Sequence, residues 1–234
     1  MPLLVTAKML GAAGLASYAL ARLSMHQRWI GWSRKHVVAV PVDALPAMPA
    51  GYSVRDMTAD ELSRHRIDIG AAAQAARFAQ GLTCLAAFNR KDQLCGVIWL
   101  ANGSCVEDGM PVRFVPPADA GFDTGMWIAP SHRLGRAFAA LWAGAGAWLS
   151  ARGLAWSIST IADYNFTSMA AHRRLGMIDL GCATFASLAR QRWLKLNDGQ
   201  GWQRVDMDER ADWCLSITSD PVGLTDRLAP AQSG

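Results

Sequence analysis

Several features that mark other protein classes are scarce or missing in this 234-residue sequence. Its five cysteines lie far apart and include no CxxC pair, which argues against a disulfide framework or a zinc site. We therefore expect reduced thiols and no metal. The net charge of +4 is spread without a block of lysines and arginines, so we expect no nucleic-acid partner. A hydrophobic fraction of 51% instead indicates a globular protein with a sizeable core.

The sequence also lacks an uncharged apolar run long enough to cross a membrane. In the apolar segment 3–23 the uncharged part extends only from Met9 to Ala21, whereas a spanning helix needs about 20 apolar residues. A signal peptide is one alternative, because Ala19-Leu20-Ala21 has the form of a cleavage site. We favour a helix that either packs on the domain or contacts a membrane peripherally through residues 3–35, where cations and indoles follow it. The expected location is the cytoplasm, with the inner membrane surface as the alternative.

The order of the predicted elements indicates three regions. Residues 1–50 should hold the apolar helix, a short strand at 37–42 and a linker, residues 51–188 an α/β domain, and residues 189–234 an extension that completes or covers its sheet. Predicted strands of the domain cover residues 52–57, 83–89, 93–100, 105–115, 122–129, 154–160 and 177–188, and predicted helices cover 58–81 with a break at Gly70, 135–153 and 163–175.

Two of these strands, 122–129 and 154–160, are joined through a helix. Such a βαβ unit makes its two strands parallel, whereas the earlier strands, joined by turns, form an antiparallel meander. The predicted fold class is therefore α/β, with a mixed central sheet flanked by helices.

The loop between the strand ending at Ala129 and the next helix is the predicted active centre. A polar loop before a helix directs free backbone N–H groups and the positive end of the helix dipole toward one point, which suits a phosphate. Gly135 permits close approach of a ligand, and Arg133 and Arg136 can add charge-assisted hydrogen bonds. A solvated turn with surface arginines is the alternative that these residues leave open.

Two motifs, in this order, resemble the GCN5-related N-acetyltransferase (GNAT) superfamily. The first is Trp127-Ile128-Ala129-Pro130 followed by His132-Arg133-Leu134-Gly135-Arg136-Ala137, and the second is Asn165-x-x-Ser168-x-x-x-His172-x-x-Leu175-Gly176-Met177. The family's loop has Gln or Arg, two residues, Gly, one residue, then Gly or Ala, so His132 departs from it while Gly135 and Ala137 match. The resemblance covers about Gly51 to Leu188.

The resemblance implies the GNAT fold and a cofactor clamp. The fourth and fifth strands of that fold, which correspond here to the strands around Trp127 and Trp156, would splay apart to admit the pantetheine arm of acetyl-CoA or another acyl-CoA. The implied cofactor-binding residues are Trp127, Ile128, His132, Arg133, Leu134, Gly135, Arg136, Ala137, Asn165 and Ser168.

The catalytic candidates are one histidine and two carboxylates. His172 stands where many members of the family have a tyrosine that protonates the leaving thiolate, and an imidazole can do the same near neutral pH. Its alternative is an ordinary buried histidine. Glu107 and Asp123 are the carboxylates expected to bind the acceptor amine and take its proton, and their alternative is a solvated strand end.

The resulting prediction is an acyl-CoA-dependent N-acyltransferase, with N-acetyl transfer as the first choice, in which a small-molecule or peptide amine attacks the thioester directly. Two alternatives remain: a long-chain acyl-CoA or acyl carrier protein dependent N-acyltransferase at the membrane surface, and a non-catalytic acyl-CoA-binding or interaction module. Whether the chain forms a homodimer is left open.

Overall fold

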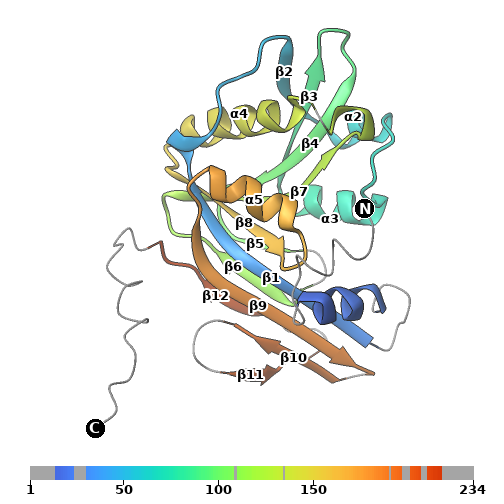
Figure 1. Cartoon of the computed structure of the whole chain (residues 1–234), viewed down its shortest axis with the longest axis vertical. Coiled ribbons are helices and arrows are strands. Elements are labelled where there is room, and N and C mark those ends of the chain that lie inside the picture. The colour runs from blue at the N-terminus through green and yellow to red at the C-terminus, as the bar shows by residue number, and fades with distance from the viewer. Residues whose placement is uncertain are drawn as a thin grey trace.

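The computed structural model describes residues 14–23, 30–107, 110–133, 135–189, 191–196, 201–206 and 210–217. Its centre is a nine-stranded mixed sheet (Figure 1). The strands of this sheet are β1 (Ile30–Pro41), β2 (Tyr52–Met57), β3 (Thr83–Asn89), β4 (Leu94–Ala101), β7 (Ala120–Ile128), β8 (Trp156–Ala162), β9 (Ile178–Leu188), β10 (Gln191–Lys195) and β11 (Trp202–Arg204). Their spatial order is β11-β10-β9-β1-β8-β7-β4-β3-β2.

The predicted mixed sheet is confirmed. Strands β2, β3, β4 and β7 form an antiparallel meander, and β8 then pairs with β7 in parallel. The helix α4 (Ala137–Ser150) makes the crossover between them. It buries Leu141, Trp142 and Leu149 completely against sheet residues such as Ile98 and Leu100. Each large side chain removed from water in this way contributes about 1.5–3 kcal/mol, so α4 is held firmly on the sheet behind the predicted site.

The other helices begin where the sequence predicts. A capping box on Thr58 starts α2 (Ala59–Ser63), because its hydroxyl accepts from the Glu61 N–H while the Glu61 carboxylate accepts from the Thr58 N–H. Gly70 separates α2 from α3 (Ala71–Ala79). The side chain of Asn165 caps α5 (Phe166–Arg174) by accepting from the Ser168 N–H at 3.2 Å. Short 3-10 turns, η1 (Val42–Ala44) and η2 (Pro130–His132), complete the described helical elements.

Strand β1 is the largest departure from the sequence-based expectation. Residues 1–50 are predicted to precede the domain and to contain only a short strand, yet β1 runs antiparallel to both β8 and β9, between them (Figure 1). Its second half, 37–40, is fully buried, as expected of a strand covered on both faces. Its first half is polar and half-buried, which hid its length from the hydrophobic pattern. The sheet therefore needs a segment that the sequence places outside the domain.

The helix at residues 14–23 packs on this sheet. The Ser17 hydroxyl donates to Asp163 and accepts from the Trp32 indole N–H, each at 2.9 Å, and Ala21 is buried. Tyr18 is half-buried against the ring of Tyr164, whereas three leucines of the helix are exposed: Leu15, Leu20 and Leu23. Packing on the domain is thus observed for the part of the apolar segment that the structure describes. No helix among the described residues has the length and hydropathy needed to span a membrane.

The segment 105–115 does not form the single strand predicted for it. It makes two short strands, β5 (Cys105–Val106) and β6 (Val112–Val115), of a separate three-stranded sheet. The third strand there, β12 (Ala211–Cys214), pairs in parallel with β6, while β10 and β11 extend the main sheet. The C-terminal extension therefore completes both sheets as far as residue 217, and Asp108 and the tail beyond 217 lie outside the described residues.

Candidate active site

The pairing between strands β7 and β8 ends about halfway along their length. Their parallel pairing joins Ala120 to Trp156 and continues only to Asp123 and Ser159, although β7 extends to Ile128 and β8 to Ala162. Beyond this point β7 and β8 are not paired with each other, and we call the region between their unpaired ends the opening. One detail differs from the prediction: Trp127 lies at the open end, but Trp156 lies at the closed end, opposite Ala120.

A β-bulge marks the start of the open part of β7. Thr124 pairs with Trp99 and Trp127 with Val97, so two residues of β7, Gly125 and Met126, oppose one residue of β4. Gly125 has φ +61°, and a Cβ built there would lie 2.0 Å from Nη1 of Arg77. Arg77 is buried on α3 with its guanidinium 5.5 Å from the centre of the Trp99 ring. The bulge therefore requires glycine, and it places a buried cation against the backbone beside the opening.

The end of β7 presents the backbone of Ile128 to the opening. The Ala129 N–H donates to the Cys95 carbonyl of the β4 side at 2.9 Å. Because backbone groups of successive strand residues point in opposite directions, those of Ile128 point toward β8, where no strand pairs with them. The Ile128 carbonyl accepts from Arg133 Nε at 3.3 Å. Both residues predicted to contact pantetheine pair with β4, Trp127 with Val97 and Ile128 with Gly96. In the alternation of this ladder, the backbone groups of Trp127 point toward β4 and those of Ile128 point away from it.

The predicted phosphate loop follows directly. The turn η2 leads through His132 and Gly135, whose N–H donates to the His132 carbonyl at 3.0 Å, to the start of α4 at Ala137. No described side chain caps this helix, and Arg133, Gly135 and Arg136 are exposed around its first turn. A Cβ on Gly135 would lie 3.3 Å from the His132 carbonyl oxygen, so the loop is tight there. Exposed arginines and uncapped N–H groups fit a phosphate. Leu134 lies outside the described residues.

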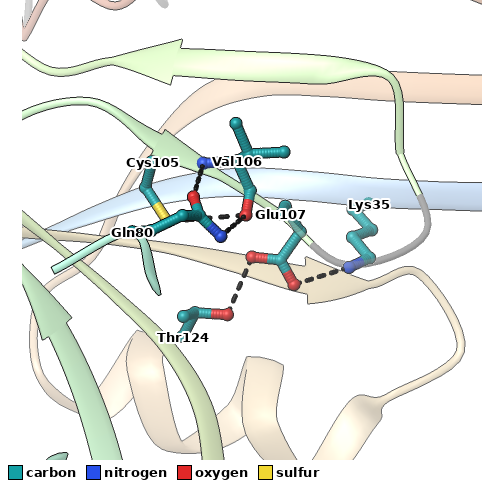
Figure 2. Close-up of polar contacts among 6 residues, drawn as sticks. All are labelled: Lys35, Gln80, Cys105, Val106, Glu107 and Thr124. Atoms are coloured by element: carbon teal, nitrogen blue, oxygen red, sulfur yellow. Dashed lines mark hydrogen bonds and ion pairs between the residues drawn. The ribbon is translucent and has the colours of Figure 1, made fainter. Parts of the chain in front are cut away.

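Glu107 belongs to a polar cluster that spans the opening (Figure 2). Its carboxylate accepts from Lys35 Nζ at 2.7 Å and from the Thr124 hydroxyl at 2.8 Å. Thr124 stands on β7, and Lys35 of β1 pairs with Ala162 at the open end of β8. Gln80 holds the strand that precedes Glu107, since its side-chain oxygen accepts from the Val106 N–H at 3.0 Å. The side-chain ammonium group of Lys35 is therefore already bound to the carboxylate that was predicted to bind the acceptor amine.

Lys35, Thr124 and Gln80 were not predicted as site residues. They come from β1, β7 and the end of α3, and no local motif links these segments. The long-range register of the sheet, which sequence patterns do not contain, is what brings them to Glu107.

Asp123 and His172 belong to a second cluster, which is buried. The Asp123 carboxyl accepts from the hydroxyls of Ser157 and Ser159, both at 2.6 Å. His172 of α5 places Nε2 3.3 Å from the Ser159 hydroxyl and Nδ1 2.8 Å from the Ser168 carbonyl oxygen. Burial raises the pKa of Asp123, and the nearby His172 and the two hydroxyls oppose that rise only in part. Ser159, which links the two predicted residues, is a further site residue that the sequence did not reveal.

The two predicted carboxylates do not converge on one point. Asp123 and Thr124 are neighbours on β7, so their side chains point to opposite faces of the sheet, and Glu107 is bonded to Thr124. The expectation that Asp123 and Glu107 together bind one amine is therefore wrong in its geometry. Each carboxylate has its own partners on its own face.

The five cysteines are free, as predicted, and three of them are buried. Among the residues that the structure describes, no three side chains of His, Cys, Asp or Glu are grouped so that they could hold a metal ion.

No protein-family model and no curated protein sequence matches this chain. Solved structures with a similar fold include a functionally unknown conserved protein from Staphylococcus epidermidis (TM-score 0.48, 10% identity, 74% of this chain covered). A tandem GNAT protein from the clavulanic acid biosynthesis pathway (0.41, 17%, 80%) and a GCN5-related N-acetyltransferase from Kribbella flavida (0.40, 16%, 73%) are also similar. This chain spans 66%, 59% and 63% of the lengths of these three proteins. The names of the second and third of these proteins include GNAT and GCN5-related N-acetyltransferase.

Proposed function

We propose that this protein is an acyl-CoA-dependent N-acyltransferase of the GNAT superfamily. The observation that carries the proposal is the opening between β7 and β8, which lies directly before the uncapped N-terminus of α4. An extended thioester arm can enter between two strands only where their pairing has ended, and its phosphates need a donor-rich anchor nearby. The order of these two features along the chain supplies both.

The residues around the opening can promote direct transfer. The acceptor nitrogen forms a bond to the thioester carbonyl carbon, the carbon–sulfur bond breaks, and one proton moves from the amine to the departing thiolate. The backbone N–H of Ile128, which points into the opening, is suited to bind the oxyanion of the intermediate. Holding the two reactants in alignment would supply much of the rate enhancement.

Calorimetric titration with acetyl-CoA and longer acyl-CoAs tests the binding half of the proposal. Binding should weaken by about tenfold or more in Arg133→Ala and in Arg136→Ala, because each removes a charge-assisted hydrogen bond to phosphate. Arg152→Ala is a matched control, since Arg152 stands beyond the opposite end of α4 and contacts Trp148. Absence of binding to every thioester, including acyl carrier protein conjugates, would overturn the proposal.

Release of free CoA with a panel of amines tests the catalytic half. Turnover with any primary amine or peptide N-terminus supports the transferase. If acyl-CoA binds tightly and no amine ever releases CoA, the non-catalytic acyl-CoA-binding module takes its place.

The exposed leucines of the helix at 14–23 favour a second candidate, acyl transfer at a membrane surface with a long-chain donor. Leu15, Leu20 and Leu23 are exposed although Ser17 and Ala21 hold the same helix on the domain. Flotation of the full chain with anionic vesicles should fall when Leu15 and Leu23 are both changed to Ser. Equal flotation of the two proteins would remove this candidate.

A further inference from the structure

The polar cluster of Asp123, Ser157, Ser159 and His172 is enclosed between β7, β8 and α5. Each of these four side chains is at most 6% exposed. Ser157 and Ser159 alternate along β8 on the face that α5 covers, so both hydroxyls reach the one carboxyl of Asp123 on β7. Only the second hydroxyl continues to His172. The cluster is therefore a chain of three groups, carboxyl, hydroxyl and imidazole, with Ser157 as a side branch.

The hydrogen bonds of His172 define where its protons are. The Ser168 carbonyl oxygen can only accept, so Nδ1 at 2.8 Å from it must carry a hydrogen. The other ring nitrogen, Nε2, faces the Ser159 hydroxyl, and that hydroxyl has a single hydrogen to give either to Asp123 or to Nε2.

Two arrangements satisfy every group with the same number of protons. In the first, Asp123 is a neutral acid that donates to the Ser159 oxygen, and Ser159 donates to the bare Nε2. In the second, Asp123 is a carboxylate that accepts from Ser159, and Nε2 carries a hydrogen that it donates to the Ser159 oxygen. Two coupled proton transfers, from Asp123 to the Ser159 oxygen and from the Ser159 hydroxyl to Nε2, convert the first arrangement into the second. The net change is one proton moved from the carboxyl to the imidazole. If Asp123 were ionised and His172 neutral, Ser159 would donate its hydrogen to Asp123. The lone pair of Nε2 would then face the Ser159 oxygen without a hydrogen between them, so this arrangement is unfavourable.

We propose that Asp123, Ser159 and His172 form a proton relay, in which the Ser159 hydroxyl carries a single proton between the buried carboxyl and the imidazole. Ser159 is the positioning residue of this relay. It is the last residue of β8 that pairs with β7, so the relay lies where the two strands begin to part.

The charged surroundings keep one proton in the relay. Burial disfavours the carboxylate of Asp123 and raises its pKa, and Glu107 on the opposite face of the sheet acts in the same direction. Glu107 is itself compensated by Lys35 of β1. On the α4 side the His172 ring packs perpendicular to the ring of Trp142, with 5.4 Å between the ring centres, and Arg173 and Arg174 of its own helix are exposed.

The role of the relay in turnover rests on the proposed function. The Ser168 hydroxyl lies 3.5 Å from Nδ1 of His172 and is half-exposed at the start of α5. When Nε2 receives the relay proton, the imidazole carries a hydrogen on both nitrogens, and the Nδ1 hydrogen can then leave through this hydroxyl. The relay would give its proton to the departing thiolate and recover one from the acylated amine nitrogen. Over a full cycle the protons balance, and no other reactant is needed.

Nitrogen-15 spectra of the imidazole rings test the relay without any substrate. The His172 signals, identified among the five histidines by their loss in His172→Gln, report how much hydrogen resides on Nε2. Asp123→Asn should shift the Nε2 signal in the otherwise native protein and in Ser157→Ala, but not in Ser159→Ala. Ser157→Ala is the matched control, because it removes an equally short bond to Asp123 without touching His172. Equal responses to Asp123→Asn in the Ser157→Ala and Ser159→Ala proteins would overturn the relay.

A second variant guards against a simple folding defect. Ser159→Cys keeps the size of the side chain but bonds weakly, and it should uncouple Nε2 from Asp123 in the same way while the thermal transition stays cooperative. If Asp123→Asn still shifts the Nε2 signal in the folded Ser159→Cys protein as it does in the native one, the hydroxyl is not the carrier and the proposal fails.

With an amine that turns over, Ser159→Ala should lower kcat by about tenfold to a hundredfold with little change in KM, and it should reduce the solvent deuterium isotope effect. Ser157→Ala should have the smaller effect on both. An unchanged isotope effect in Ser159→Ala would overturn the relay's part in turnover. If no thioester is ever consumed while the Nε2 coupling is present, the proposed function fails and the relay stands.

Discussion

Glu107 and Asp123 are two buried carboxyl groups beside the same opening, but their environments differ in kind. Glu107 meets an ammonium ion and a hydroxyl, so its negative charge is compensated. Asp123 meets two hydroxyls and has no cation in direct hydrogen-bond contact among the described side chains. An ionised carboxylate is stable inside a protein mainly when a cation is close, so the first group favours charge and the second favours a bound proton.

This difference assigns the two faces of the sheet to different chemistry. On one face the Glu107 carboxylate is bound by the Lys35 ammonium group, and under the proposed function this face would receive the acceptor amine. On the other face the proposed relay through Asp123 would protonate the leaving group. From the sequence we had expected both carboxylates, on neighbouring strands, to bind the same acceptor amine.

The largest effect on stability is expected from a substitution in the β-bulge of β7, which directly follows Asp123 and Thr124 in the chain. Gly125→Ala should lower the free energy of unfolding by about 3 kcal/mol, because the left-handed backbone and the contact with Arg77 both oppose a Cβ. Gly153→Ala is the control, since Gly153 also has a positive φ but no atom within 4 Å of a built Cβ, and should cost about 1 kcal/mol. Equal losses in urea unfolding would show that Arg77 does not press on this backbone.

Replacing each carboxyl with a neutral amide should destabilise the protein to different extents. Glu107→Gln should destabilise the protein by about 2 kcal/mol, because Lys35 is left as an incompletely compensated charge near the surface of the opening. Asp123→Asn should cost less than about 1 kcal/mol, because a neutral group already suits that site. The double change Lys35→Met with Glu107→Gln should recover part of the first loss. A larger loss for Asp123→Asn than for Glu107→Gln would reverse the assignment of charge.

The pH dependence of stability should separate native protein from Asp123→Asn. Because the pKa of Asp123 is raised in the folded state, the native state binds more protons than the unfolded state once the pH exceeds the unfolded value of about 3.9. The contribution of Asp123 to stability therefore falls as pH rises from there to the folded pKa and is constant above it. The asparagine variant should gain in relative stability over that window, as measured by denaturant midpoints. A constant difference would mean that Asp123 is not perturbed.

A similarly small effect is expected at Thr124. Thr124→Val keeps the shape of the side chain and removes its hydrogen bond to Glu107, so we expect a loss of about 1 kcal/mol. Thr124→Ser keeps the hydroxyl and should lose less than the valine variant. Should the two variants unfold at the same denaturant concentration, the hydroxyl contributes nothing to the compensation of Glu107.

The sequence predicted well what depends on local pattern. The helices at 59–79, 137–150 and 166–174 and the order of the meander and βαβ unit all follow from spacing along the chain. The loop before α4 was also found, because turn residues and a helix start are local signals. These features place a candidate phosphate site and the opening, and the motif position selects His172, but they do not show how the candidate catalytic residues are connected.

Features that depend on distant pairing were missed. Lys35 reaches Glu107 only because β1 inserts beside β8, and Ser159 reaches Asp123 only through the parallel register. Serine in a strand and lysine near the N-terminus carry no signal of their own, so neither was a candidate. The strand predicted at 105–115 was wrong for a related reason, since its residues pair with β12 from the far end of the chain.

The insertion of β1 also has a consequence for biosynthesis. A ribosome completes β1 early, but both neighbours of this strand, β8 and β9, emerge only after the whole meander and α4. Until then its fully apolar part, 37–40, has no strand to pair with and is a segment that chaperones or other nascent chains can bind. The last major step in forming the sheet is therefore the closing of β8 and β9 around the first strand, so any chain that begins at Gly51 should yield two half-sheets with exposed edges.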